Sequence, residues 1–174
     1  MLEDIKDQWQ PGENGCVTCH KVVDCLNLNK TELYNRTMNY FVSNYGDVDS
    51  VIQERDTVNG IIAAKGVFKN VHTLNDVLQT NIVDTWHILK VEVKDGKARI
   101  TISLTQYNET VKGSMLPDVH YLYPITEQYP YNPNAYQKQL YEQAFCNSHL
   151  KALETINLVE RALTEGVATK KDEW

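Results

Sequence analysis

Hydrophobic and polar positions near the start of the chain predict one strand followed by one helix. Over residues 16–26 one face is apolar, as in a half-buried strand; its members are Val17, Cys19, Val23 and Cys25. Over residues 30–45 apolar side chains recur at helical spacing; they are Tyr34, Met38, Phe41, Val42 and Tyr45. Asn29 and Glu32 have the spacing of a capping box, and Gly46 is a suitable stop, so both ends of this helix are marked.

The residues that follow predict a run of antiparallel strands. We expect strands at residues 51–56, 60–69, 82–93 and 98–105. Asn59-Gly60 is a hairpin signal between the first two strands, and residues 94–97 form a tight turn between the last two. We interpret residues 70–81 as a polar connection or a short helical turn.

The last of these strands has the clearest alternation. Ala98, Ile100, Ile102 and Leu104 share one face, and Arg99, Thr101, Ser103 and Thr105 share the other. This pattern is typical of an antiparallel sheet with one face toward solvent. Arg99 and Thr101 are therefore candidate binding residues on the polar face.

The last third of the chain predicts an irregular segment and a long helix. Residues 107–132 hold several prolines and five tyrosines, which are Tyr107, Tyr121, Tyr123, Tyr129 and Tyr131. Asn132-Pro133 is a strong helix start, and the apolar stripe continues to residue 165. A helix over 133–165 would be about 50 Å long. Because a small sheet cannot cover that length, we hypothesise that this helix forms a homo-oligomer.

Together these elements predict an α+β fold. We expect a curved antiparallel sheet of about five strands with two helices packed on one face, in the order β-α-β-β-β-β-α. Residues 1–15 are expected to be an irregular lead-in, residues 16–166 a single domain, and residues 167–174 a polar tail.

Composition and charge narrow the classes of partner. The chain has 174 residues, of which 42% are hydrophobic, and its net charge is −6 without any basic run. Phosphate contacts dominate nucleic-acid affinity, so we exclude nucleic acid as the main partner. No apolar run approaches the length of a membrane span. The charged start of the chain shows no signal peptide, and a lipid anchor on a leader before Met1 stays open.

The sequence Cys16-Val17-Thr18-Cys19-His20 matches the c-type haem attachment pattern. A zinc site built from Cys16, Cys19, His20 and Cys25 is a second interpretation. Both conflict with the predicted strand, which sends neighbouring side chains to opposite faces. We therefore expect ordinary strand residues and no cofactor. A disulfide between Cys146 and the first strand is a further alternative if the protein is exported.

Catalytic and binding residues are harder to find. Cys19 or Cys146 could act with His87 or His149, but nothing in the sequence brings a pair together, and no nucleophile elbow occurs. We expect His87 to be a hydrogen-bonded histidine in or beside the core. Tyrosines suit binding surfaces because they offer large contact areas with polar tips. Tyr121, Tyr123, Tyr129 and Tyr131 are thus candidate binding residues, or else rings that cap the core.

Four phrases in this order resemble one family: "KTELYNRTMNYF", "VIQERDTVNGIIAAKG", "YPITEQYP" and "YQKQLYEQAF". They look like the family described as domain of unknown function 4468, with a TATA-binding-protein-like fold. The resemblance runs from about Cys16 to Leu163. It implies an exported protein or lipoprotein of a host-associated Gram-negative gut-type bacterium, and it brings no established activity and no catalytic residues.

Three functional hypotheses follow from these observations. The leading one is a non-catalytic module outside the cytoplasm that binds a protein or a small ligand. The alternatives are a haem- or metal-carrying redox protein that uses Cys16, Cys19 and His20, and a hydrolase with an unrecognised site.

Overall fold

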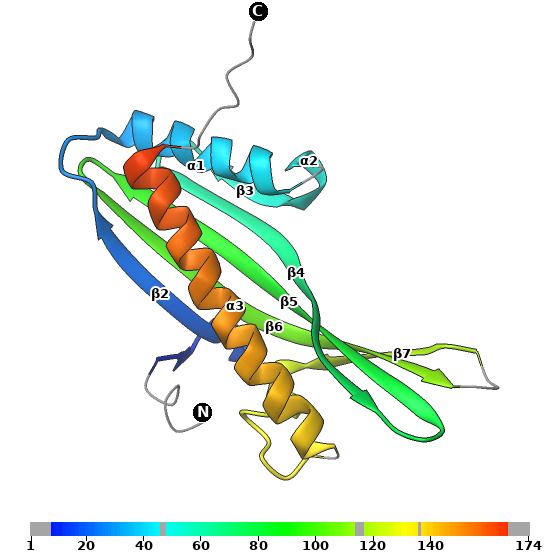
Figure 1. Ribbon diagram of the computed structural model, residues 1–174. Coiled ribbons are helices and arrows are strands. Elements are labelled where there is room, and N and C mark those ends of the chain that lie inside the picture. The colour runs from blue at the N-terminus through cyan, green and yellow to red at the C-terminus, as the bar shows by residue number, and fades with distance from the viewer. Residues whose placement is uncertain (1–7, 46–47, 114–116, 136, 167–174) are drawn as a thin grey trace, which may run out of the picture. The chain divides into compact units, whose positions relative to one another are not determined.

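The computed structural model describes residues 8–45, 48–113, 117–135 and 137–166. Its strands are β1 (Gln10–Pro11), β2 (Val17–Asp24), β3 (Ile52–Asp56), β4 (Ile61–Asn75), β5 (Gln79–Lys94), β6 (Lys97–Gly113) and β7 (Val119–Pro124). Its helices are η1 (Glu13–Gly15), α1 (Lys30–Asn44), α2 (Val48–Val51), η2 (Ile125–Glu127) and α3 (Lys138–Glu165). These elements confirm the α+β class (Figure 1).

All seven strands belong to one sheet, in the order β1-β2-β6-β5-β4-β3, with β7 paired to β6 beside this path. The predicted number of about five strands is therefore too small. The two strands that the sequence did not indicate are β1, in the expected lead-in, and β7, in the expected irregular segment. None of the described helices is both long and apolar enough to cross a membrane.

The chain forms two compact units, which we describe separately. The first unit comprises Met1–Cys19, Lys65–Leu89 and Ile102–Glu154. The second comprises His20–Ala64, Lys90–Thr101 and Thr155–Trp174. The expected boundaries of a single domain over 16–166 remain a prediction, and the tail 167–174 lies outside the described residues.

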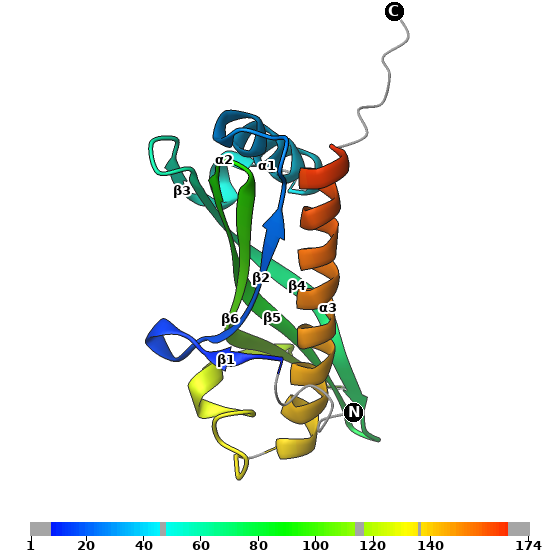
Figure 2. The same ribbon diagram turned by 90° about the vertical axis from the view of Figure 1, so that its left-hand side faces the viewer.

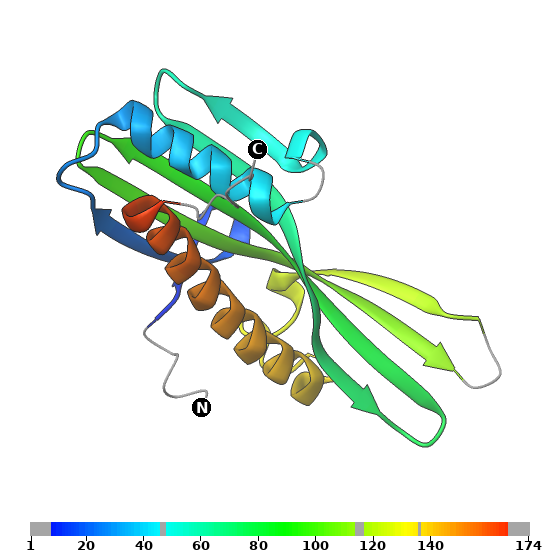
Figure 3. The same ribbon diagram turned by 45° about the horizontal axis from the view of Figure 1, so that its top comes forward.

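In the second unit, helix α1 forms where the sequence predicted it, but of the predicted apolar stripe only Phe41 is fully buried, and Val42 is 60% exposed. The Asn29 side chain accepts a hydrogen bond of 2.8 Å from the backbone N–H of Glu32. The buried face of the helix consists of Leu33, Thr37, Tyr40 and Phe41. Arg36 donates to the carbonyl of Leu163 at 2.8 Å and so ties α1 to the end of α3 (Figure 3). The predicted stop, Gly46, lies outside the described residues.

The alternation in β6 is confirmed, with one change of phase. Ala98, Ile100, Ile102 and Leu104 are buried, and the residues between them are exposed or half-buried. Thr105 and Gln106 are both half-buried, and after them the odd positions Tyr107 and Glu109 are the buried ones. The two faces of the strand therefore exchange at Thr105–Gln106.

The predicted connection over 70–81 is wrong, because β4 continues to Asn75 and β5 begins at Gln79. Asn70 has a positive φ of 49° inside β4. Its backbone N–H donates to one carboxylate oxygen of Asp84 at 2.8 Å, and Lys69 donates to the other at 2.9 Å. Asp84 thus holds a local irregularity within the strand. The apolar residues Leu74, Val77 and Leu78 of this hairpin are exposed, so no alternation of buried apolar and exposed polar residues marked it.

The predicted irregular segment over 107–132 is wrong in two places. Strand β6 continues to Gly113, and β7 pairs with it antiparallel through six consecutive positions. These pairs include Tyr107 with Tyr123 and Glu109 with Tyr121. Pro124 ends β7, where a missing N–H disrupts no later pairing.

The last helix begins later than predicted, at Lys138 instead of residue 133. The Asn132 carbonyl accepts the N–H of Ala135 in a turn, and Gln137 has a φ of 60°, which a helix cannot contain. The helix is therefore 28 residues long, shorter than expected. Self-association through it remains a prediction.

Candidate functional site

The Cys16–His20 motif is divided between the core and the surface. Cys16 precedes β2 and is half-buried, Cys19 on β2 is 2% exposed, and His20 is exposed. Cys25 is buried after the strand, and all four cysteines are free thiols. Within the described ranges, no group of three or more His, Cys, Asp or Glu side chains is arranged to hold a metal ion.

Cys19 instead belongs to a chain of three polar side chains in the first unit, in which Cys19 and His149 are buried and the third, Gln8, is exposed. Its sulfur lies 3.4 Å from Nδ1 of His149 on α3. The other ring nitrogen of His149, Nε2, lies 3.3 Å from Oε1 of Gln8. The amide oxygen of Gln8 can only accept, so Nε2 carries the proton and Nδ1 accepts from the thiol. The structure thus pairs one of the cysteines with one of the histidines that the sequence could not bring together.

Burial keeps this thiol–imidazole pair uncharged. Loss of water raises the pKa of the Cys19 thiol to about 11 and lowers the pKa of the His149 imidazole. A thiolate–imidazolium pair needs the opposite shifts. With both groups buried, Cys19 is therefore a hydrogen-bonded thiol without nucleophilic character.

His87 on β5 departs from the prediction of a hydrogen-bonded histidine. It is 3% exposed, and neither of its ring nitrogens has a hydrogen-bond partner in the described structure. Its ring stacks on Phe68 of β4 with centroids 3.9 Å apart. Burial lowers the pKa of His87 to about 4, so the ring is neutral at pH 7 and packs as an aromatic side chain.

Glu109 on β6 is a buried carboxylate that the sequence analysis did not single out. It is 2% exposed and accepts from Nδ2 of Asn81 at 2.6 Å and from the hydroxyl of Tyr141 at 2.8 Å. Glu109 pairs directly with Tyr121 of β7. This network joins β5, β6 and α3 at the position where β7 attaches.

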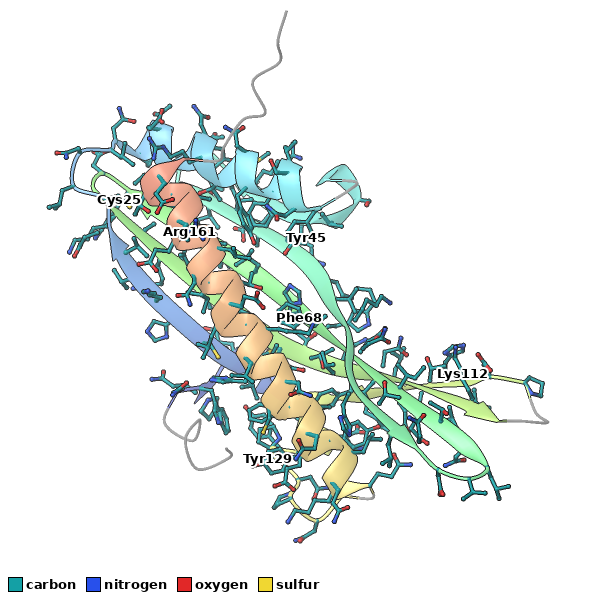
Figure 4. The ribbon with its side chains drawn as sticks, in the orientation of Figure 1. Cys25, Tyr45, Phe68, Lys112, Tyr129 and Arg161 are labelled. Carbon is teal, nitrogen blue, oxygen red and sulfur yellow. The ribbon has the colours of Figure 1, made fainter. Side chains whose placement is uncertain are left out.

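Tyr129 and Tyr131 are structural residues of the first unit. Tyr129 lies near the first turns of α3 (Figure 4), and its ring is edge-on to Phe145 of that helix, with centroids 5.5 Å apart. The Tyr131 hydroxyl donates to the carbonyl of Cys16 at 2.9 Å, and its ring meets Trp9. Both side chains are half-buried, and their assignment as binding residues stays a prediction.

Tyr121 on β7 is more accessible than Tyr129 and Tyr131, whereas Tyr123 on the same strand is half-buried as they are. The rings of Tyr121 and Tyr123 stack with centroids 6.0 Å apart, and Tyr123 also meets Tyr141 edge-on at 5.8 Å. Tyr121 is 44% exposed, and Leu122 between them is 63% exposed. The strand pairs with β6 alone (Figure 1), so its other edge has no partner strand among the described residues.

Arg99 and Thr101 lie on β6 in the second unit, away in the chain from the tyrosines. Arg99 borders a hollow of about 410 Å³. The other residues around this hollow are Val22, Asn59, Glu92, Val93, Lys94, Lys97 and Ala98. Thr101 does not line it, and Glu92 lies 3.9 Å from Arg99. The assignment of a binding surface to Arg99 and Thr101 stays a prediction.

A family model described as domain of unknown function (DUF4468) with TBP-like fold matches residues 20–108. The chain belongs to the DUF4468 family. This confirms the resemblance that the four sequence phrases indicated. The family description names a fold and assigns no activity.

Two crystal structures agree with this DUF4468 assignment. One is a TBP-like protein from Parabacteroides distasonis ATCC 8503, with a TM-score of 0.61 and 16% identity, covering 90% of this chain and 97% of that one. The other is a DUF4468 family protein from Bacteroides ovatus ATCC 8483, with a TM-score of 0.50 and 15% identity, covering 97% and 98%. At these identities the likeness shows the fold alone. No curated protein matches the chain.

For this DUF4468 protein, sequence reasoning missed Glu109, Gln8 and the strand character of β7. Glu109 alternates with Tyr107, which was the available signal, but the phase change at Thr105–Gln106 puts both residues on the face that the earlier alternation marks as polar. Gln8 lies in a segment without periodicity, so only the folded structure could place it beside His149.

Proposed function

We propose that this chain is a non-catalytic binding module and that its binding surface is the open edge of β7. The observation that supports this most is the composition of that edge. Residues 119–124 contain no acidic residue, lysine or arginine, and Val119, Tyr121 and Leu122 are each at least 44% exposed. Natural proteins usually protect an edge strand with charges, so an uncharged apolar edge is a feature with a purpose.

The chemistry of an open edge selects the kind of ligand. The outward N–H and C=O groups of a strand pair best with another extended backbone, which would add a strand beside β7. Alternating side chains then give specificity. Here the ligand would meet Tyr121 and Tyr123 on one face and Leu122 on the other, so we propose an extended, uncharged peptide segment with apolar or aromatic residues.

The edge is also held in a fixed position. Six consecutive pairs join β7 to β6, and the hydroxyl of Thr110 lies 3.0 Å from Nδ1 of His120. The Glu109 network fixes the residue opposite Tyr121. A strand that is already ordered loses little conformational entropy on binding, which favours affinity.

A displayed library of random ten-residue peptides tests this proposal. We expect selection on the wild-type protein to enrich uncharged apolar and aromatic peptides. Leu122→Lys should weaken their binding, measured by fluorescence polarisation, by at least about tenfold, since it removes an apolar contact and adds a charge. Gln53→Lys, which adds the same charge to the edge strand β3, is the matched control and should leave binding unchanged.

N-methylation of the peptide separates strand addition from other modes of binding. Methyl groups on alternate backbone nitrogens should abolish binding in one of the two registers and leave the other nearly unchanged. Equal loss in both registers, binding that Leu122→Lys does not alter, or no enrichment of peptides would contradict the proposal.

We also propose that the protein acts outside the cytoplasm. The support is the family resemblance, which implies export. Treatment of intact native cells with an external protease, followed by detection of this chain, is the test. Degradation in cells that retain their cytoplasmic proteins supports the proposal, and protection in cells stripped of their outer layer contradicts it.

A further inference from the structure

The start of the described chain covers the Cys19–His149 pair in the first unit. Gln8 is exposed apart from its contact with His149, and Trp9 is half-buried. The Trp9 ring meets Phe145 edge-on at 5.6 Å and Tyr131 at 6.3 Å. We call residues 8–9 the strap. Contacts of Trp9 with Phe145 and Tyr131, and of Gln8 with His149, place it against α3 and the segment before α3, and β1 follows it in the chain (Figure 2).

The pair under the strap has the geometry of an activated thiol. Cys19 Sγ, His149 Nδ1, His149 Nε2 and Gln8 Oε1 follow one another in the order thiol, base and orienting amide. Papain-like cysteine proteases use a cysteine, a histidine and an asparagine in these roles. Here the thiol and the ring are 2% and 0% exposed, so the arrangement is present and water is excluded from it.

Loosely held segments open far more often than the whole protein unfolds. Release of the strap removes the indole that packs on Phe145 and the amide that contacts His149. The imidazole would then meet water, which restores its basicity, while Nδ1 keeps its place beside the sulfur. The pair therefore stays neutral because the strap, in its closed position, keeps water away from it.

We propose that residues 8–9 are a removable strap, and that Cys19 with His149 as its base is a modification site for small uncharged electrophiles when the strap lifts. The His149 Nδ1 takes the thiol proton as sulfur attacks the electrophilic carbon. With an α-haloamide, a carbon–sulfur bond forms, the carbon–halogen bond breaks, and halide leaves with the electron pair. The site is small and buried, with Cys19 2% and His149 0% exposed, and a charged reagent would have to lose its water to enter it, which favours an uncharged one.

Iodoacetamide labelling, followed by peptide mass spectrometry of each cysteine, tests this inference on the full chain. We expect Cys19, which is 2% exposed, to react faster than Cys25, which is 6% exposed, and with a shallower dependence on urea, because local opening exposes less surface than global unfolding. Trp9→Ala should accelerate Cys19 labelling by about tenfold, since it removes two aromatic contacts. Glu13→Ala, an exposed change in the same segment, should not.

The pH profile identifies the base. In Trp9→Ala the labelling rate of Cys19 should rise with a midpoint near that of a solvated histidine, about 6.5, and not near that of a free thiol, about 8.5. His149→Gln in the same background should move the midpoint toward the thiol value. Labelling of Cys19 with the urea dependence of global unfolding would overturn the strap, and an ordinary thiol midpoint in Trp9→Ala would overturn the role of His149.

Discussion

Two strands with an open edge, β3 and β7, differ in how that edge is protected. Strand β3 has three consecutive exposed polar residues, Gln53, Glu54 and Arg55, and its pairing with β4 shifts register between Ile52 and Glu54. Strand β7 has six residues paired without a shift and carries apolar and aromatic side chains. Charges and register shifts both oppose the addition of another strand. One edge is therefore closed to strand addition, and the other is open to it.

This difference indicates that the two edges are under different constraints. An edge that only ends the sheet needs protection against aggregation, which β3 has. The edge of β7 lacks it although the neighbouring network around Glu109 is fully buried and well bonded. A strand that is firmly anchored but carries no charges against strand addition suits the proposed role in binding.

The largest effect should come from the anchor of β7. Glu109→Ala leaves Asn81 and the Tyr141 hydroxyl without their buried acceptor, so we expect the free energy of unfolding to fall by about 3 kcal/mol. Glu54→Ala, the same change on the exposed edge β3, should stay within about 0.5 kcal/mol. Urea unfolding at pH 7 measures both. Similar small values for the two variants would remove the contrast between an anchored and an unanchored edge.

Acid should weaken the unit that carries β7. The folded pKa of His87, about 4, lies below the ordinary value of 6.5, so protonation favours the unfolded chain. Above pH 6.5 the neutral His87 does not lower the free energy of unfolding. As the pH falls from 6.5 to 4, the free energy of unfolding decreases by about 3 kcal/mol.

His87→Leu is the control for this acid effect, because a leucine keeps the apolar contact with Phe68 without a titrating group. Urea unfolding at several pH values should show a smaller slope between pH 6.5 and 4 for this variant. Hydrogen exchange on β7 and β3 then reports which edge loosens first. An unchanged pH slope in His87→Leu would refute the assignment.

The hairpin that holds β3 should be sensitive at its turn. Gly60 has a φ of 72°, and a Cβ there would lie 2.4 Å from the carbonyl oxygen of Val93. Gly166 has a φ of 82° with nothing within 4 Å of that position. Gly60→Ala should therefore cost about 2 kcal/mol more than Gly166→Ala, the usual cost of overpacking. Thermal unfolding compares the variants, and equal losses would mean that the turn tolerates a shift.

The smallest change in stability should come from a substitution that makes the edge of β3 uncharged like that of β7. Glu54→Val removes a protecting charge from β3 and should alter the free energy of unfolding by less than about 0.5 kcal/mol. It should nevertheless increase self-association, seen by light scattering at high concentration, whereas Leu122→Lys should decrease it. If neither variant changes association, edge charge does not control strand addition in this protein.

Sequence patterns predicted most of the fold because burial is one-sided there. Strand β2 and the first part of β6 each bury one face, and their periodicity was readable; α1 was placed by its Asn29 cap and helical spacing, although its buried face differs from the predicted stripe. The 70–81 part of the β4–β5 hairpin and β7 were missed for a common reason, since both have many exposed residues and lack a clean alternation. Asn132-Pro133 predicted a helix start, but Asn132 begins a turn, Gln137 has a positive φ, and the helix begins at Lys138.

The candidate sites were less predictable than the fold. Tyr121 and Tyr123 were identified by residue type, but their accessibility depends on β7 having only one neighbour. The Cys19–His149 contact joins residues 130 positions apart, and no local pattern encodes such a distance. The haem-like spacing at Cys16–His20 is local, and strand geometry separates its members.

The exchange of faces at Thr105–Gln106 also makes the molecule easy to alter by insertion or deletion. Removal of one residue there shifts the following pairs by one position, and a one-residue slip turns every later side chain to the opposite face. Glu109 would then leave the interior, and its pairing with Tyr121 would be lost. A single three-nucleotide change in the gene could thus present a different set of side chains at the open edge, while the strands before position 105 remain as they are.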